Sequence, residues 1–333
     1  MKYAKIELHL HLDGSIDLVW GYKTALKRRV IDEKTTFEQY YSMMYKNDYP
    51  TREERMKKFD FPCAVMQEKE DLSDSVYYLA KRLNELGLIY AEVRFAPQQH
   101  TLAGCNQKEA ILAVVEGIKR AERDFPDLTI KLINCLMHKG KDADVNMKEN
   151  METVEATRET LGKYVVALDL AGYENTGDFM KYAPLFEKAR EYGIPYTIHA
   201  GEMGDGSHVL DALKMKAYRI GHGINCVDHP DWLKAMVESQ IPMEVCVSSN
   251  CGDGRNYAAH PIMKMLEAGC NITLNSDNMM FSRTNILNEH AQLRSIGVTE
   301  EQLRQCMENA VNAAFCDEET KIQLRKKLEI EGV

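Results

Sequence analysis

The segment IYAEVRFAPQQHTLAGCNQKEAILAVVEGIKRAERDFPDLTIKLINCLM (residues 89–137) contains the pattern from which the fold can be predicted. It begins and ends with short runs rich in apolar and β-branched residues, IYAEVRFA (89–96) and IKLINCLM (130–137), which are typical of buried strands. Between them, KEAILAVVEGIKRAERDF (108–125) has apolar residues three and four positions apart, the spacing of an amphipathic helix. The segment therefore predicts a strand, a helix and a second, parallel strand.

Runs of the same kind recur along the chain, and with these two we count eight. The other six are KIELHL (5–10), VVALDLA (165–171), PYTIHA (195–200), YRIGHG (218–223), PMEVCVSS (242–249) and NITLNSD (271–277). Stretches with helical spacing, such as DSVYYLAKRLNELG (74–87), lie between them. Eight strands alternating with helices predict an α/β fold, a (β/α)8 TIM barrel whose active site lies at the carboxyl ends of the strands. An open, doubly wound sheet is the alternative.

The interval between the first two runs, residues 11–88, is too long for an ordinary connection and predicts a helical insertion over the barrel mouth. Its aromatic residues could cap the flat ring of a ligand or pack the inserted helices together. They include Trp20, Phe37, Tyr40, Tyr41 and those of KKFDFP (57–62). Because no repeat or Ser/Gly/Pro linker interrupts the chain, we expect residues 1–333 to form a single domain.

Composition limits the partners and the location. The formal net charge of −9 disfavours nucleic acid as a partner, since such binding relies on clustered Lys and Arg. Neither a signal-peptide pattern nor an apolar run of about 18 residues is present, which disfavours secretion and membrane insertion. The nine cysteines form no CxxC pair and indicate reduced thiols. We therefore expect a cytoplasmic protein that binds a small molecule, and no motif indicates a protein partner.

Histidines and carboxylates gather where the predicted strands end. His9 and His11 are two residues apart, so both side chains leave the same face of the first strand, an arrangement that suits one metal ion. An isolated HxH more often consists of ordinary hydrogen-bonded histidines. His199 ends the fifth run, however, and Asp277 ends the eighth. Three imidazoles and one carboxylate are a ligand set that Zn²⁺ accepts, and room for a water molecule makes such a site catalytic.

Two further residues are candidates for proton transfer. A bound Zn²⁺ lowers the pKa of its water to about 7, so a hydroxide is available at neutral pH. Glu202 in HAGE and His222 in RIGHG follow adjacent predicted strands and can exchange protons near that pH. The alternatives are that His222 is structural and that Glu202 caps the following helix.

Nine blocks of sequence carry a resemblance to a known family. In order they are ELHLHLDGS (7–15), KKFDFP (57–62), YAEVRFAP (90–97), LDLAGYE (168–174), HAGE (199–202), RIGHG (219–223), EVCVSSN (244–250), HP (260–261) and TLNSDN (273–278). With these blocks the chain resembles the adenosine deaminases, above all the bacterial ones. The resemblance implies zinc-dependent hydrolytic deamination of adenosine and 2′-deoxyadenosine to inosine and deoxyinosine, with release of ammonia, in purine salvage.

The same resemblance assigns roles residue by residue. It implies that one Zn²⁺ is bound by His9, His11, His199 and Asp277. Glu202 exchanges a proton with purine N1, and His222 positions the attacking hydroxide. The substrate contacts that it implies are His11, Asp13 against the ribose hydroxyls, the Gly172 backbone N–H at purine N3, and Asn278. From residue type alone, Gly172 could instead serve a turn and Asp13 could cap a helix.

Departures from the family pattern keep the substrate open. Asn278 stands where many relatives have a second aspartate, and its amide can donate to purine N7 without first being protonated. The loop CGDGRNY (251–257), with Arg255, and the basic HKGK (138–141) could bind a phosphate. AMP, N6-methyl-AMP, adenine and aminodeoxyfutalosine are therefore alternative substrates. A catalytically inactive, nucleoside-binding barrel is the alternative from another class.

Overall fold

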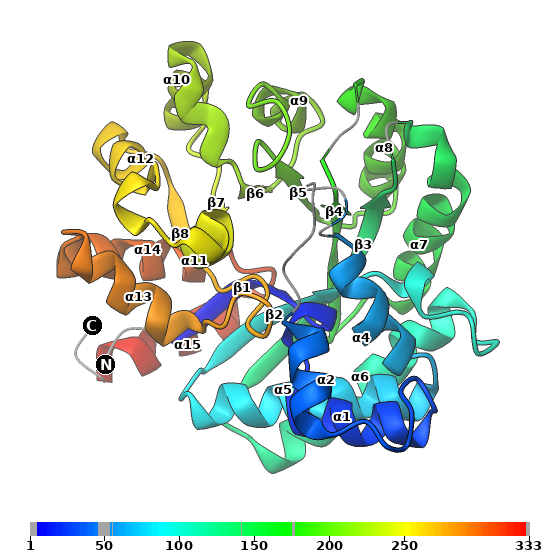
Figure 1. Cartoon of the computed structure of the whole chain (residues 1–333). Coiled ribbons are helices and arrows are strands. Elements are labelled where there is room, and N and C mark those ends of the chain that lie inside the picture. The colour runs from blue at the N-terminus through cyan, green and yellow to red at the C-terminus, as the bar shows by residue number, and fades with distance from the viewer. Residues whose placement is uncertain (1–4, 46–53, 55, 141, 175–176, 331–333) are drawn as a thin grey trace.

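The computed structural model describes residues 5–45, 54, 56–140, 142–174 and 177–330. Parallel strands form two four-stranded sheets in the order β1-β2-β3-β4 and β5-β6-β7-β8. Their bounds are β1 Ile6–His11, β2 Tyr90–Phe95, β3 Thr129–His138, β4 Val165–Gly172, β5 Thr197–Ala200, β6 Arg219–His222, β7 Met243–Val245 and β8 Ile272–Leu274. Single parallel bridges, Leu10 with Asp277 and Leu168 with Tyr196, join the two sheets into a closed barrel. The predicted TIM barrel is thus confirmed (Figure 1).

Helices surround this barrel. They are α1 Leu18–Lys27, α2 Phe37–Met44, α4 Asp60–Val65, α5 Lys69–Glu85, α6 Gln107–Asp124, α7 Met147–Thr160, α8 Ala183–Glu191, α9 His208–Lys214, α10 Pro230–Ser239, α11 Val247–Cys251, α12 Ile262–Ala268, α13 Ile286–Ser295, α14 Glu300–Ala313 and α15 Glu318–Ile330. The predicted helical segments 74–87 and 108–125 correspond to α5 and α6. No helix in the described ranges combines the length and the hydropathy that crossing a membrane requires.

Two predicted strands are shorter than expected. The seventh run was predicted to be extended through Ser249, but β7 ends at Val245 and α11 begins at Val247. The eighth run was predicted to end at Asp277, but β8 ends at Leu274. The φ of Asp277 is 59°, in the left-handed region, so regular strand geometry cannot continue through this residue.

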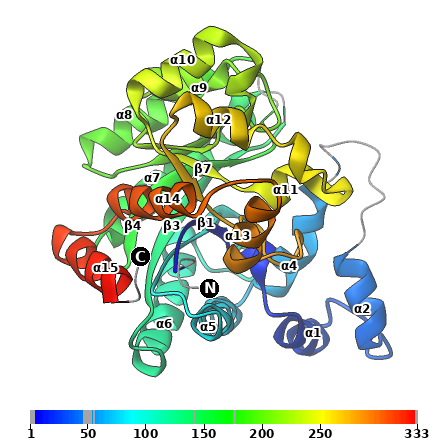
Figure 2. The same ribbon diagram turned by 90° about the vertical axis from the view of Figure 1, so that its left-hand side faces the viewer.

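The predicted insertion after the first strand contains α1, α2 and α4, and α1 and α2 lie side by side at one edge of the molecule (Figure 2). Its aromatic residues mostly pack the helices together. Trp20 and Tyr40 are buried, and the Phe37 ring lies 6.1 Å from the Tyr40 ring. Tyr41 is 40% exposed. Phe59 differs from these residues, because it lines the cavities described below.

Ion pairs cross the interior of the barrel. The guanidinium of Arg94 on β2 contacts Asp169 on β4 at 2.8 Å and Glu244 on β7 at 2.9 Å. Arg219 on β6 contacts Glu244 and Glu92, each at 2.6 Å. All five side chains are 1% exposed or less. Because a buried charge is costly unless it is paired, these contacts fix the strands in one register.

Gly117 allows α6 to approach α5 closely. A Cβ at this position would lie 2.1 Å from the Ser73 carbonyl oxygen and 2.4 Å from Val76 Cγ1. We expect Gly117→Ala to destabilise the protein by about 1–3 kcal/mol through overpacking, although alanine is normally the better helix former. Thermal denaturation measures the effect. Gly162→Ala is the control, since no atom lies within 4 Å of its added Cβ. Equal melting temperatures for the two variants would contradict the prediction.

Candidate active site

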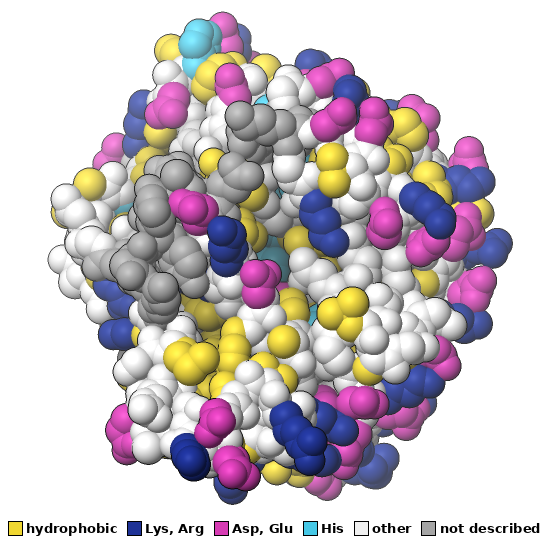
Figure 3. All heavy atoms as spheres, turned by 45° about the vertical axis from the view of Figure 1, so that its right-hand side comes forward, with side chains coloured by type: hydrophobic (Ala, Val, Ile, Leu, Met, Phe, Trp, Pro, Cys, Tyr) yellow, Lys and Arg dark blue, Asp and Glu magenta, His cyan; other side chains and the backbone are white. Residues whose placement is uncertain are grey.

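Two adjoining cavities open at the carboxyl ends of the strands. Their volumes are about 370 Å³ and about 630 Å³, and His11 and Gly172 line both of them. In Figure 3 a hollow near the centre of this face has histidine at its bottom and hydrophobic side chains beside it. The predicted residues that line the smaller cavity are His11, Gly172, His199, Glu202, His222, Asp277 and Asn278. Asp13 lines the larger one.

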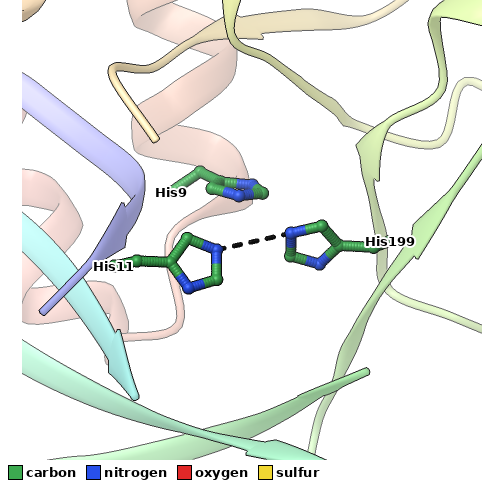
Figure 4. Close-up of side chains that lie close together, drawn as sticks. All are labelled: His9, His11 and His199. Carbon is green, nitrogen blue, oxygen red and sulfur yellow. Dashed lines mark hydrogen bonds between the residues drawn. The ribbon is translucent and has the colours of Figure 1, made fainter. Parts of the chain in front are cut away.

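Three histidines converge beneath the smaller cavity. His9 and His11 come from β1 and His199 from β5, and one nitrogen of each lies within 4.8 Å of the others (Figure 4). The Nε2 atoms of His11 and His199 are 3.4 Å apart. Asp277 Oδ1 lies 3.5 Å from His9 Nε2 and 3.4 Å from His11 Nε2. The structure thus brings the four predicted ligand side chains together.

This donor set fits a metal ion. His9 Nε2 is buried and has no hydrogen-bond partner within the described ranges, a costly state for a nitrogen unless a cation takes its lone pair. Nitrogen and carboxylate donors at this spacing are ligands that Zn²⁺ accepts. Cys246, which the sequence analysis did not single out, also lies within 4.8 Å of His9 and His222. Burial raises the pKa of its thiol well above the ordinary value.

Buried carboxylates orient two of these histidines. His9 Nδ1 lies 2.8 Å from Glu244, and His199 Nδ1 lies 3.0 Å from Asp169. When Nδ1 carries the proton and donates it, the lone pair of Nε2 points toward the other imidazoles. Arg94 binds both carboxylates. Asp169 and Glu244 lie within the blocks that carry the family resemblance, but the sequence analysis assigned them no role. Their signal was a charge inside an otherwise apolar strand.

Asp277 is held by its side chain and by its backbone. Its Oδ2 accepts a hydrogen bond of 2.5 Å from the Ser249 hydroxyl. Its backbone N–H donates to the His9 carbonyl at 2.9 Å, and its carbonyl accepts from the His11 N–H at 2.8 Å. Burial alone would raise the pKa of Asp277, but the neighbouring His9 and His11 hold it well below the ordinary value. Asp277 therefore presents a carboxylate to the histidines.

Glu202 and His222 lie side by side in the wall of the smaller cavity. His222 Nε2 lies 3.6 Å from Glu202 Oε2. The Asn250 amide nitrogen lies between them, 3.3 Å from Glu202 and 3.0 Å from His222 Nδ1. Burial and the neighbouring imidazoles lower the pKa of His222 well below the ordinary value, so its ring is neutral. Glu202 does not cap the following helix, because the N-cap of α9 is Ser207.

The three remaining predicted residues lie around the cavities. Burial raises the pKa of Asp13 to about 6, and α1 is capped by Asp17, so Asp13 is not its cap. Gly172 ends β4 with φ 107°, and a Cβ there would lie 2.7 Å from the His138 carbonyl oxygen. The conformation of this turn is by itself a sufficient reason for a glycine at position 172. Asn278 packs against Gly14, where an added Cβ would overlap its side-chain oxygen.

The two basic segments considered for phosphate binding do not form one site. Arg255 lines the smaller cavity and donates to the Ser282 carbonyl at 2.5 Å. Lys139 lines the larger cavity, His138 is buried, and Lys141 lies outside the described residues. The two segments therefore border different, adjoining cavities at the carboxyl ends of the strands.

Comparisons with known proteins agree on the family. The sequence model described as "Adenosine deaminase" matches residues 4–330. An adenosine deaminase from Haemophilus ducreyi is 35% identical over 329 residues, which cover 96% of this chain and 94% of that protein. An adenosine deaminase from Clostridium botulinum (strain Okra / Type B1) is 36% identical over 331 residues, 97% of this chain and 96% of that protein.

Solved structures share the fold at lower identity. An adenine deaminase from Arthrobacter aurescens has a TM-score of 0.87 at 23% identity, covering 98% of both chains. A zinc-bound amidohydrolase from Burkholderia ambifaria has a TM-score of 0.87 at 22% identity, covering 98% of this chain and 90% of that one. An Arabidopsis N6-mAMP deaminase has a TM-score of 0.83 at 24% identity, covering 99% and 98%. With the family match and the identities above, the chain belongs to the adenosine deaminase family and is a hydrolytic deaminase.

Proposed function

We propose that this protein is a single-domain, zinc-dependent deaminase that converts adenosine and 2′-deoxyadenosine to inosine and deoxyinosine, with release of ammonia, in purine salvage. The observation that carries the proposal is the convergence of the three histidines and Asp277 beneath a cavity that Glu202 and His222 also line. Relatives named adenosine deaminase at 35% and 36% identity support the nucleoside as substrate. The nine free thiols support a cytoplasmic location.

His9, His11, His199 and Asp277 would hold the zinc ion. A bound ion would supply Lewis-acid activation of the water molecule that attacks purine C6. Glu202 delivers a proton to purine N1, which makes C6 electrophilic. The neutral His222 ring accepts the Asn250 N–H at Nδ1, so it orients the attacking water through its Nε2–H. Asn250, between these two side chains, holds both in place.

The substrate contacts follow from the cavity walls. We assign the purine to the smaller cavity, with the Gly172 N–H at N3 and the Asn278 amide at N7. The sugar extends past His11 toward the larger cavity, where the Asp13 carboxylate accepts hydrogen bonds from ribose hydroxyls. Because its raised pKa is about 6, Asp13 is mainly ionised at neutral pH.

A nucleoside 5′-monophosphate is the second candidate substrate. Lys57 and Lys139 line the same larger cavity as Asp13, so a cation is available beside the sugar position. One solved structure with the same fold is named an N6-mAMP deaminase. The Asp13 carboxylate opposes a phosphate at this place, and therefore we favour the nucleoside.

A comparison of substrates tests the function. Ammonia release would be measured from adenosine, 2′-deoxyadenosine, adenine and AMP, and methylamine release from N6-methyl-AMP, each with and without a chelator. We expect rapid, chelator-sensitive turnover of the two nucleosides and at least about a hundredfold lower kcat/KM for the others, the discrimination that misplaced polar groups produce. Preference for AMP or N6-methyl-AMP would support the second candidate instead.

Glu202→Gln tests the proton donor. The amide keeps the shape of the side chain but cannot supply a proton to N1, so we expect kcat to fall by about 10²–10⁴-fold. Zinc content, measured by elemental analysis, should stay at the wild-type level because Glu202 is not a ligand. A variant with wild-type turnover would exclude this role.

Asp169→Asn tests how the metal ligands are oriented. The substitution removes the charge that holds the His199 ring and pairs with Arg94, so we expect metal affinity to fall by about 10–100-fold. Competition with a chelating dye measures the affinity directly. Asp71→Asn is the control, because Asp71 is also buried and paired but contacts Arg28 of the inserted helices, away from the candidate ligands. Equal affinities in both variants would contradict the assignment.

A further inference from the structure

The residues that carry Glu202 form a turn outside any helix or strand. Residues 201–204 lie between β5 and α9, and their backbone groups have no helix or sheet to pair with. Gly201 has φ 64°, which glycine adopts without strain. Such a turn can hold a side chain in one place only if other groups satisfy its N–H and carbonyl groups.

One carboxylate satisfies all four N–H groups of this turn. Glu174 Oε1 accepts the N–H of Gly201 at 2.7 Å. Its Oε2 accepts the N–H groups of Glu202, Met203 and Gly204 at 2.9, 3.1 and 3.1 Å. The two oxygens of this one side chain thus accept four consecutive backbone N–H groups. Glu174 therefore fixes the backbone of Glu202 directly.

The carbonyl groups of the turn have partners as well. The Asn225 amide donates to the carbonyls of Glu202 and Gly204 at 3.0 and 3.2 Å. A Cβ at Gly204 would lie 2.7 Å from the Glu174 carbonyl oxygen and 2.9 Å from its Cγ, so the turn packs directly on the Glu174 side chain. The four N–H groups of the turn thus bond to Glu174, and two of its carbonyl groups bond to Asn225.

Glu174 is itself fixed as an anion. Its Oε1 lies 2.6 Å from His208 Nδ1, and the His208 ring stacks on Phe179 with centroids 4.5 Å apart. Burial alone would raise the pKa of Glu174, but the hydrogen bonds from His208, Gly201 and Glu202 outweigh burial and hold the pKa below its ordinary value. An ionised carboxylate accepts these N–H bonds more strongly than a neutral acid would.

Glu174 also sets a distance across the substrate. It follows Gly172, the last residue of β4, by two positions, while the turn that it binds follows β5. In the proposed function Gly172 meets purine N3 and Glu202 meets N1, which flank the same carbon of the ring. We propose that Glu174 is a positioning residue that places Glu202 at purine N1 and thereby determines the rate of N1 protonation. This inference rests on the proposed function.

Glu174→Gln is the first test. The amide offers one acceptor oxygen in place of two, so at least one buried N–H of the turn loses its partner. A displacement of about 1 Å can cost about a hundredfold in rate, so we expect kcat to fall roughly 10–100-fold. KM and zinc content should change less than about twofold, since the remaining contacts to substrate and metal persist. A wild-type kcat would overturn the proposal, as would a change confined to KM.

A double-mutant cycle separates positioning from general damage. If Glu174 acts through Glu202, then Glu174→Gln should cause no further loss of kcat in a Glu202→Gln background. Losses that multiply across the two sites would show that Glu174 acts elsewhere and would overturn the proposal. Asp71→Asn is the control, because it perturbs a buried carboxylate on α5. The factor by which it changes kcat should be the same in the wild-type and the Glu202→Gln backgrounds.

Two further comparisons complete the test. His208→Phe keeps a ring against Phe179 and removes only one hydrogen bond to Glu174, so it serves if Glu174→Gln fails to fold. We expect a fall in kcat of a few fold at constant KM, and an unchanged kcat overturns the proposal. Wild-type activity of the Glu202→Gln variant would contradict the proposed function itself. An impaired Glu202→Gln variant beside a fully active Glu174→Gln variant would remove only this inference.

Discussion

The contact between Arg94 and its two carboxylates is the interaction on which the site depends. One guanidinium on β2 binds Asp169 on β4 and Glu244 on β7, and each carboxylate holds the Nδ1 atom of a histidine. The histidines would lose their orientation without the carboxylates, and the carboxylates would be unpaired buried charges without Arg94. The geometry of the candidate site and the stability of the barrel therefore depend on the same atoms.

Polar side chains occupy two levels of the barrel, its interior and the carboxyl ends of its strands. Ion pairs fill the interior below the site, where bulky apolar side chains are more usual, and the side chains of the candidate site lie above them at the strand ends. His222 and Asp277, with φ of 60° and 59°, occupy left-handed conformations that non-glycine residues rarely adopt. Such strain at a strand end aims a side chain into the cavity, and the surrounding hydrogen bonds compensate for its cost.

The sequence was sufficient for the fold, the insertion and the residues that meet in the cavities, because strand periodicity is local and the nine blocks are specific. The ends of the strands were harder to predict. Residues 246–249 were expected to be extended, but α11 begins at Val247. Asp169, Glu244 and Glu174 received no role, since their partners lie between 27 and 235 positions away in the chain and only the closed barrel brings them together.

The bridge between Leu10 and Asp277 closes the barrel where the first and last strands meet. One partner in that bridge is also a candidate metal ligand, and the residues that exchange hydrogen bonds with its backbone are His9 and His11. The backbone that closes the barrel thus also carries three of the candidate metal ligands. A motion that separated the first strand from the last would disperse the candidate ligands, so a metal ion bound there would hold the two ends of the barrel together.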